Sequence, residues 1–302
     1  MAKTRSLEFS GLAARLQYHL LMGLFRLAVT RGLYGRFARG LGLVFDPENS
    51  VLLRTGQSAP FRIHLNDGYW TRFALYHHPY EPEVENILTT ASGLTDLFCD
   101  LGANKGYWTT RASSLFSRVL AVEASAQTFL HLSENAAHLP NVTLHQAAIH
   151  STSGQQMTFL NTHLSHASAR LLDTDYGSPE DKTERVQTLR IDDLVPSGTA
   201  ALIKLDVEGA EVSAIDGATR ALGDGAVLIY EDHGSDPDCV PSAHLLSLGD
   251  IRLYSIEKTP EPAISVAAIR ALKTDRFKGY NFLAARSDSP LLAALLERFA
   301  KP

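Results

Sequence analysis

The chain has 302 residues, of which 45% are hydrophobic and 20% are charged, and this composition excludes a disordered or fibrous protein. Its two cysteines, Cys99 and Cys239, form no CxxC pair, which argues against a zinc ribbon, a thioredoxin motif or a disulfide scaffold. The net charge of −5 argues against a general nucleic-acid binder, so we expect no nucleic-acid partner.

The first 45 residues differ from the rest of the chain in charge. They contain seven basic side chains and one acid, Glu8, within a chain that is acidic as a whole. Leucines recur among them at helical spacing, which predicts one or two amphipathic helices. These leucines are Leu12, Leu16, Leu20, Leu24 and Leu27. No apolar run is long enough to span a bilayer and no signal peptide is recognised, so we expect a cytoplasmic protein.

Two interpretations of this basic segment stay open. A basic amphipathic helix can lie in an anionic membrane surface. Alternatively, the apolar stripe packs on the rest of the chain or on a second subunit of a homodimer. The arginines are spread around the helix, and Arg26 interrupts its most apolar run. We therefore favour packing over membrane association.

The remaining elements follow from hydrophobic patterning. Short strands are expected at 51–54 and 61–65, and then a helix over 81–91 with Pro82 in its first turn. Further strands are expected at 95–100, 118–123, 142–149, 155–160, 186–190, 200–206, 226–232, 251–257 and 280–285, with helices at 106–116, 126–139, 210–222 and 242–248. Their alternation predicts an α/β fold with a parallel sheet covered by helices on both faces. Residues 162–183 are expected to form a long loop.

A glycine-rich turn follows the first strand of this region, with the sequence Asp100-Leu-Gly-Ala-Asn-Lys-Gly106. Such a turn lets the backbone approach a ligand closely. The spacing of Gly102 and Gly106 is GxxxG, which differs from the GxGxxG of pyrophosphate binders. The carboxylate of Asp100 would repel phosphates but suits a cationic ligand. The alternative is a plain strand-to-helix turn capped by Asn104.

The next strand ends in Glu123, 23 residues after Asp100. An acid at this place accepts hydrogen bonds from ribose hydroxyls in sheets that bind nucleosides. The alternative is a surface carboxylate that merely ends a strand.

A third polar cluster lies in Ile203-Lys-Leu-Asp-Val-Glu-Gly-Ala-Glu211. Side chains alternate along a strand, so Lys204 and Asp206 share one face. Glu231 and His233 share a face of the following strand. If the two strands are neighbours, these four side chains meet at the carboxyl ends of the sheet, where open α/β sheets bind ligands. The alternative for Lys204 and Glu231 is a structural ion pair.

These motifs resemble the FkbM-type S-adenosylmethionine-dependent methyltransferases over about residues 80–286. The motifs that carry the resemblance are Asp100-x-Gly-Ala-Asn-x-Gly106, Val122-Glu123, the stretch 203–211, Tyr80-Glu-Pro-Glu83, Thr188-Leu-Arg-Ile-Asp-Asp-Leu194, Glu231-x-His233 and Asn281-Phe-Leu-Ala284. The resemblance implies a Rossmann-like sheet of about seven strands, S-adenosylmethionine as methyl donor, and hydroxyl acceptors on sugars or secondary metabolites. At Ala124-Ser125 the chain departs from the Glu-Pro that the family often has there.

The resemblance also implies roles for individual residues. Cofactor binding is expected of Asp100, Gly102, Ala103, Asn104, Gly106, Glu123, Ala124, Ala148 and Asp206, and catalysis of Asp206, His233, Glu208 and Lys204. A sugar hydroxyl is a poor nucleophile, so we expect Asp206 or His233 to assist its deprotonation, with His163 and His166 as alternatives. No cluster of metal ligands occurs in the sequence, so no catalytic metal is expected.

The sequence thus predicts a doubly wound α/β O-methyltransferase that acts on a small-molecule or glycan acceptor. The expected parts are an N-terminal helical and β extension over 1–79, a methyltransferase domain over 80–288 and a C-terminal helix over 289–302. The alternatives are a nicotinamide-dependent oxidoreductase on a similar sheet and a non-catalytic methyltransferase-like binding module.

Overall fold

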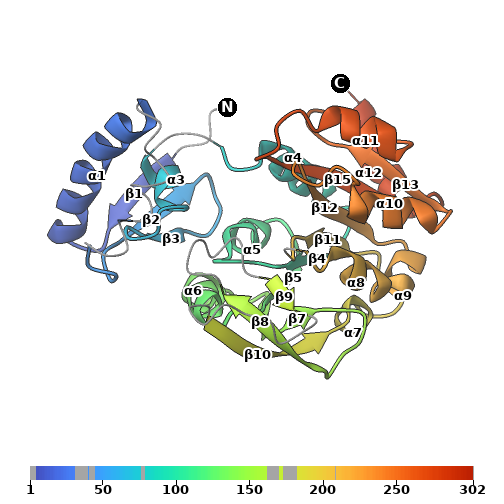
Figure 1. The fold of residues 1–302 in the computed structure, drawn as a ribbon, viewed down its shortest axis with the longest axis horizontal. Coiled ribbons are helices and arrows are strands. Elements are labelled where there is room, and N and C mark those ends of the chain that lie inside the picture. The colour runs from blue at the N-terminus through green and yellow to red at the C-terminus, as the bar shows by residue number, and fades with distance from the viewer. Residues whose placement is uncertain are drawn as a thin grey trace. The chain divides into compact units, whose positions relative to one another are not determined.

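The computed structural model describes residues 5–30, 40, 45–75, 79–161, 170–172, 182–207 and 209–301. The chain divides into two compact units, Met1–Glu81 and Pro82–Pro302, and each is described by itself (Figure 1). The three functional parts expected from the sequence stay a prediction. No helix among the described residues is long and apolar enough to cross a membrane.

The N-terminal unit contains a three-stranded antiparallel sheet. Its strands are β1 (Arg5–Phe9), β2 (Ser50–Thr55) and β3 (Phe61–His64), and its helices include α1 (Leu12–Thr30) and α3 (Thr71–Leu75). The expectation that the whole segment 1–45 is helical is wrong for β1. Leu7 and Phe9 alternate there with the more exposed Ser6 and Glu8, which is the period of a strand.

Helix α1 confirms the amphipathic helix, but within the N-terminal unit it packs through another face than the predicted stripe, whose packing on a second subunit stays a prediction. Four leucines of the predicted stripe, Leu12, Leu16, Leu20 and Leu27, are more than half exposed. The buried side chains are instead Ala14, Gln17, Tyr18, Leu21 and Phe25. Tyr18 accounts for this choice, because its ring packs against Phe9 with centroids 5.1 Å apart and its hydroxyl donates to the carbonyl of Ala74 at 3.2 Å. An aromatic ring buries more apolar area than a leucine, so the face that carries the rings packs on the sheet.

An eight-stranded sheet forms the centre of the C-terminal unit, in the order β14-β13-β15-β12-β11-β4-β5-β6. Six of its strands, from β13 to β5, are labelled in Figure 1. Its strands are β4 (Leu97–Leu101), β5 (Arg118–Glu123), β6 (Val142–Gln146), β11 (Leu202–Leu205), β12 (Val227–His233), β13 (Ile251–Ser255), β14 (Glu261–Pro262) and β15 (Gly279–Arg286). The strands from β12 to β6 run parallel, whereas β15, β13 and β14 pair antiparallel. This is the predicted Rossmann-like α/β sheet, with the two-residue β14 as an eighth strand.

The helices of this unit include the predicted ones, one of them divided, and two that the sequence did not predict, at 191–194 and 266–272. They are α4 (Pro82–Ala91), α5 (Tyr107–Ala112), α6 (Ala126–Ala136), α7 (Ile191–Leu194), α8 (Glu211–Asp216), α9 (Thr219–Gly223), α10 (Val240–Ser247), α11 (Val266–Leu272) and α12 (Pro290–Ala300). The single helix expected over 210–222 is wrong, because α8 and α9 are separated at Gly217. A Cβ at Gly217 would lie 2.5 Å from the carbonyl oxygen of His150, so the backbone packs too closely there for any larger residue.

A second, four-stranded sheet has the order β7-β10-β8-β9. Its strands are β7 (Ala148–Ile149), β8 (Gln156–Asn161), β9 (Arg170–Leu172) and β10 (Lys182–Leu189). The expected strand over 142–149 is therefore divided between the two sheets. The loop expected over 162–183 is wrong at 170–172 and 182–183, which belong to strands, and its other residues lie outside the described part of the chain.

The two central strands are buried along their whole length. All residues of β4 and β11 are buried, as expected of parallel strands covered on both faces. Only Asp100 on β4 and Lys204 on β11 interrupt this apolar pattern with charge. The sheet thus places two charged side chains side by side in its interior.

The turn after β4 requires glycine for close packing. Gly102 has φ +81, and a Cβ there would lie 1.7 Å from the carbonyl oxygen of Asp206. Gly198 has a similar φ of +73, but nothing lies within 4 Å of a Cβ built on it. Comparing substitutions at Gly102 and Gly198 therefore separates the cost of positive φ from the cost of steric overlap.

We predict that Gly102→Ala destabilises the protein far more than Gly198→Ala. The second change adds only the strain of positive φ, about 1–2 kcal/mol, whereas the first also forces β4 and β11 apart at their ends and costs at least about 2 kcal/mol more. Urea unfolding measures both losses. Equal losses for the two variants would show that the contact with Asp206 does not require glycine.

Candidate functional site

Polar side chains gather on one face of the sheet where its parallel strands end. β11 pairs with β4 so that Lys204 stands opposite Asp100, and with β12 so that Lys204 stands opposite Ile229. Because side chains alternate between faces, Asp206 and Glu231 lie on the same face as Lys204. The structure thus brings these four charged residues to the edge where α/β sheets bind ligands.

The amide hydrogens of the glycine-rich turn all donate within the protein. Two of them donate to the carbonyl of Val122, and one donates to a carboxylate oxygen of Glu123 at 2.9 Å. The remaining two donate to the carbonyl of Ala103 and the side chain of Asn104. The five donors are Gly102, Ala103, Asn104, Lys105 and Gly106. This turn therefore has no spare amide for a phosphate, unlike the turns that bind pyrophosphate.

Glu123 ends β5 with both carboxylate oxygens held by the backbone. Its Oε2 accepts from the N–H of Asn104 and its Oε1 from the N–H of Ser125, both at 2.9 Å. Burial raises the pKa of Glu123 to about 7, although these amides and that of Ala124 favour the charged form. The carboxyl group is therefore fixed in orientation and titrates near neutral pH.

Asp100 is buried and is held by a side chain that no motif of the sequence indicates. The hydroxyl of Thr109, on α5, donates to Oδ2 of Asp100 at 2.6 Å. Burial raises the pKa of Asp100, whereas Lys204 and Thr109 act in the opposite direction. The position of Thr109, one strand-to-helix turn after Asp100, is the signal in the sequence from which its role could have been inferred.

Lys204 forms an ion pair with a carboxylate at the end of its own strand. Its Nζ lies 2.8 Å from Oδ2 of Asp206, and the alternative of a structural pair with Glu231 stays a prediction. The side chain of Lys204 is 4% exposed and that of Asp206 is 24% exposed. The lysine therefore lies inside the sheet and the aspartate lies nearer to solvent.

His233 lies at the exposed end of β12 with its Nδ1 already engaged. The backbone N–H of Ser235 donates to this nitrogen at 3.1 Å, and the hydroxyl of Ser235 lies 2.6 Å away from it. An amide can only donate, so Nδ1 is the acceptor and the neutral ring carries its hydrogen on Nε2. In this tautomer Nε2 cannot accept a proton, which disfavours His233 as a base.

Glu231 belongs to a cluster formed by motifs that are distant in the sequence. It stands opposite Asn281 of β15. The amide of Asn281 donates to Oε1 of Glu83 in the first turn of α4 at 3.0 Å. A Cβ at Gly279 would lie 2.3 Å from the carboxylate of Glu231. Two acids and an amide therefore gather where β12 and β15 pair.

The small residues expected at the cofactor site have packing roles. Ala103 lies in an apolar cluster with Leu132 of α6, and a Cβ at Gly106 would lie 2.7 Å from the same leucine. Ala148 is buried beside Val186, and Ala124 packs against both. These positions keep the turn close to α6 and β5 close to the second sheet.

The last acid of the 203–211 motif also has a structural role. Oε1 of Glu211 accepts from the N–H of Gly209 at 3.0 Å, and burial raises the pKa of Glu211. It thereby closes the turn that follows Asp206. Glu208, which was expected to be catalytic, lies outside the described residues, as do His163 and His166.

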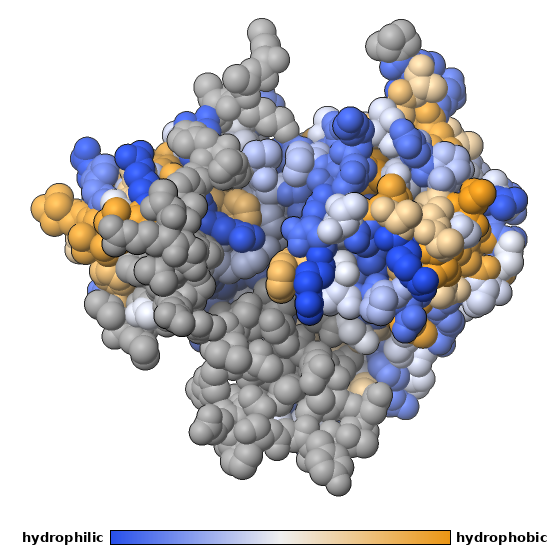
Figure 2. All heavy atoms as spheres, turned by 45° about the horizontal axis from the view of Figure 1, so that its top comes forward, coloured by the Kyte–Doolittle hydropathy of each residue, from blue (hydrophilic) through white to orange (hydrophobic). Residues whose placement is uncertain are grey.

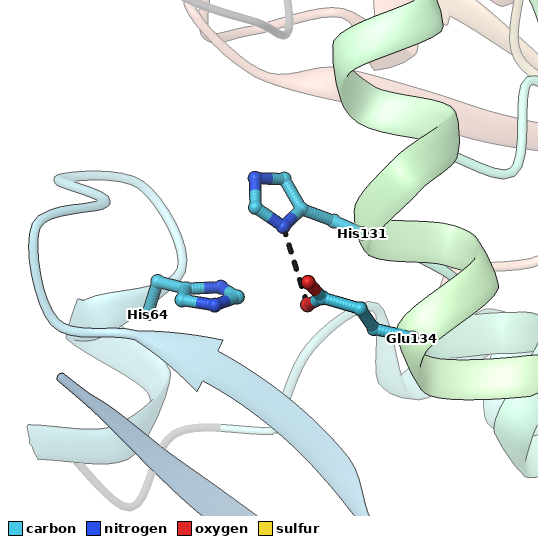
Figure 3. A group of neighbouring side chains, drawn as sticks. All are labelled: His64, His131 and Glu134. Atoms are coloured by element: carbon cyan, nitrogen blue, oxygen red, sulfur yellow. Dashed lines mark hydrogen bonds and ion pairs between the residues drawn. The ribbon is translucent and has the colours of Figure 1, made fainter. Parts of the chain in front are cut away.

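A histidine and a glutamate of α6 lie one helical turn apart. Figure 3 shows Nδ1 of His131 and Oε2 of Glu134, which are 3.4 Å apart and partly exposed. His64, drawn in the same figure, ends β3 of the N-terminal unit. A surface pair of this kind contributes little to stability. The absence of a catalytic metal stays a prediction.

Comparisons with known proteins agree with the resemblance. The profile of the methyltransferase FkbM domain matches residues 100–259. The hexuronic acid methyltransferase AglP of Haloferax volcanii is 29% identical over 161 residues, which cover 52% of this chain and 64% of AglP. This chain therefore spans less than two thirds of the length of that curated relative.

Two solved structures also match. The methyltransferase FkbM from Methylobacillus flagellatus has a TM-score of 0.40 and 18% identity, over 72% of this chain and 52% of that chain. The O-methyltransferase from Bacillus cereus in complex with SAH has a TM-score of 0.40 and 13% identity, over 71% of this chain and 86% of that chain. The FkbM domain profile alone covers more than half of the present sequence, and the chain therefore belongs to the FkbM methyltransferase family.

Proposed function

We propose that this protein transfers a methyl group from S-adenosylmethionine to a hydroxyl oxygen of a sugar, a glycan or a secondary metabolite. The observation that carries the proposal is the strand edge itself, which combines several carboxylates with a glycine-rich turn whose five amides are all engaged. Such an edge suits a cationic donor and does not suit a diphosphate.

The residues present fit this cofactor. Glu123 accepts hydrogen bonds from the amides of Asn104, Ser125 and Ala124, and a carboxylate offers about four acceptor positions, so one remains for a ribose hydroxyl. Asp100 and Asp206 supply negative charge close by, as expected for a ligand that carries a sulfonium. When bound, S-adenosylmethionine supplies an activated methyl group, and the protein must orient the acceptor and remove its proton.

A sugar acceptor is supported by two observations. AglP, with which this chain shares 29% identity, is named as a hexuronic acid methyltransferase. In addition, Glu83, Asn281 and Glu231 form a cluster of carboxylate and amide groups where β12 and β15 pair. Groups of these types bind the several hydroxyls of a sugar, because each hydroxyl both donates and accepts.

Asp206 is the base that the geometry supports best. It lies on the site face, is partly exposed and is anchored through Oδ2 by Lys204. A fixed carboxylate within reach of the acceptor can take its proton as the bond to the methyl group forms. Lys204 is then a positioning residue, because it acts through Asp206.

Ligand binding tests the cofactor proposal directly. We predict that S-adenosylhomocysteine binds in isothermal titration calorimetry, whereas NAD gives no heat of binding at the same concentrations, because the turn lacks amides for a diphosphate. Methyl transfer to a panel of sugars and uronic acids then tests the acceptor. Binding of NAD in preference would favour the oxidoreductase alternative, and binding without turnover on any hydroxyl acceptor would favour a non-catalytic module.

The pKa of Glu123 predicts a pH dependence of binding. Hydrogen bonds from ribose hydroxyls favour the charged carboxylate, whereas the free protein keeps Glu123 protonated below about pH 7. Affinity for S-adenosylhomocysteine should therefore fall on acidification below pH 7, by up to about tenfold per pH unit. Glu123→Gln should bind about 1–3 kcal/mol more weakly at pH 8 and lose this dependence. If the affinity of the wild-type protein and that of Glu123→Gln depended on pH in the same way, Glu123 would not bind the cofactor.

Turnover separates the two candidate bases. Asp206→Asn preserves an oxygen for Lys204 but removes the base, so kcat should fall about 10²–10⁴-fold with the fold retained. His233→Ala should change kcat much less, since Nδ1 is engaged by Ser235. Circular dichroism controls for folding. A large loss of kcat in His233→Ala, with Asp206→Asn still active, would show that His233 and not Asp206 is the base.

A further inference from the structure

Helix α1 carries a leucine face that the described residues of its own unit leave exposed. This face consists of Leu12, Leu16, Leu20, Leu24 and Leu27, and four of these side chains are 74%, 63%, 55% and 54% exposed, with Leu24 half-buried. Figure 2 shows hydrophobic side chains at the surface near the left edge of the view, where α1 lies. Scattered exposed leucines are normal, but a contiguous row along one helix indicates an interaction surface.

The opposite face of α1 is anchored, so the leucines cannot turn inward. Ala14, Leu21 and Phe25 are fully buried, and Tyr18 is fixed by Phe9 and by the carbonyl of Ala74. Rolling the helix to bury the leucines would expose these residues instead. The leucine face is therefore a stable feature of the N-terminal unit.

Basic side chains line one flank of the leucine face. Arg15, His19 and Arg26 are exposed and are spaced by four and seven residues, which places them in one row along the helix. Helix α1 contains no aspartate or glutamate. Within α1, Arg15 and Arg26 thus share one flank of the leucine face, whereas the other arginines of the sequence argument, Arg31, Arg36 and Arg39, lie outside the described residues.

We propose that α1 docks the protein on an anionic membrane surface. The leucines enter the boundary between headgroups and acyl chains, and the row of basic residues lies against anionic headgroups. A second copy fits less well. A twofold contact through the leucine face would bring two identical basic rows into one interface, with no acid on either helix to balance them.

Vesicle flotation with the full-length protein tests the proposal. We expect binding to vesicles of 70% phosphatidylcholine and 30% phosphatidylglycerol, loss of binding at high salt, and little binding to pure phosphatidylcholine. Leu16→Gln/Leu20→Gln and Arg15→Glu/Arg26→Glu should each lower the partition coefficient at least about 20-fold. Leu130→Gln and Arg252→Glu, which change an exposed leucine and an exposed arginine of the other unit, are matched controls. Thermal unfolding verifies that each variant folds.

Three results would overturn the proposal. The first is no binding to anionic vesicles by the folded wild-type protein. The second is equal loss of binding in the control variants, which would indicate non-specific adsorption. The third is a concentration-dependent dimer in analytical ultracentrifugation that Leu16→Gln/Leu20→Gln dissociates, together with no vesicle binding, which would assign the leucine face to a second copy of the chain.

Discussion

The burial of one ammonium group in the centre of the sheet is the constraint on which the candidate site depends. The side chain of Lys204 is 4% exposed, and an isolated charge at such a position would be strongly destabilising. Asp206 pairs with it at 2.8 Å, and Asp100 stands opposite it on β4. Lys204 compensates both carboxylates, which repel each other, and thereby keeps them at the strand edge where a cationic ligand would meet them.

Backbone contacts also join the strand ends that carry these charged residues. The N–H of Asp206 donates to the carbonyl of Leu101 at 2.9 Å, and Gly102 packs directly on the carbonyl of Asp206. From this turn, the N–H of Asn104 reaches the carboxylate of Glu123. The ends of β11, β4 and β5 are therefore joined by short contacts, which fix the carboxylates in position before any ligand binds.

Much of this arrangement could be predicted because it depends on local patterns. The alternation of strands and helices indicated the sheet, and the strand expected at 118–123 has those bounds in the structure. The glycines and acids at the strand ends indicated where a site would lie. What the family resemblance added, namely the cofactor and the chemistry, could not have come from these patterns alone.

Where the structure differs from what the sequence predicts, the cause is a contact between distant residues, which a local sequence pattern does not reveal. Both faces of α1 are apolar. Which of them is buried depended on the contacts that Tyr18 makes with Phe9 and Ala74 in other elements. The ion pair between Lys204 and Asp206 depended on the length and direction of the lysine side chain, which the residue pattern does not give. The predicted helix over 210–222 is interrupted at Gly217, where the carbonyl accepts from the N–H of Asp192 and the backbone of the distant His150 packs closely.

A double-mutant cycle on the buried charges tests the account most directly. Lys204→Met should strongly lower the free energy of unfolding, because it leaves buried carboxylates without their cation. In the Asp100→Asn background the same change should cost at least about 1 kcal/mol less, because one of those carboxylates is already neutral. Urea unfolding of the four proteins at pH 8 gives this coupling. Additive losses would contradict the claim that Lys204 is what holds the carboxylates at the strand edge.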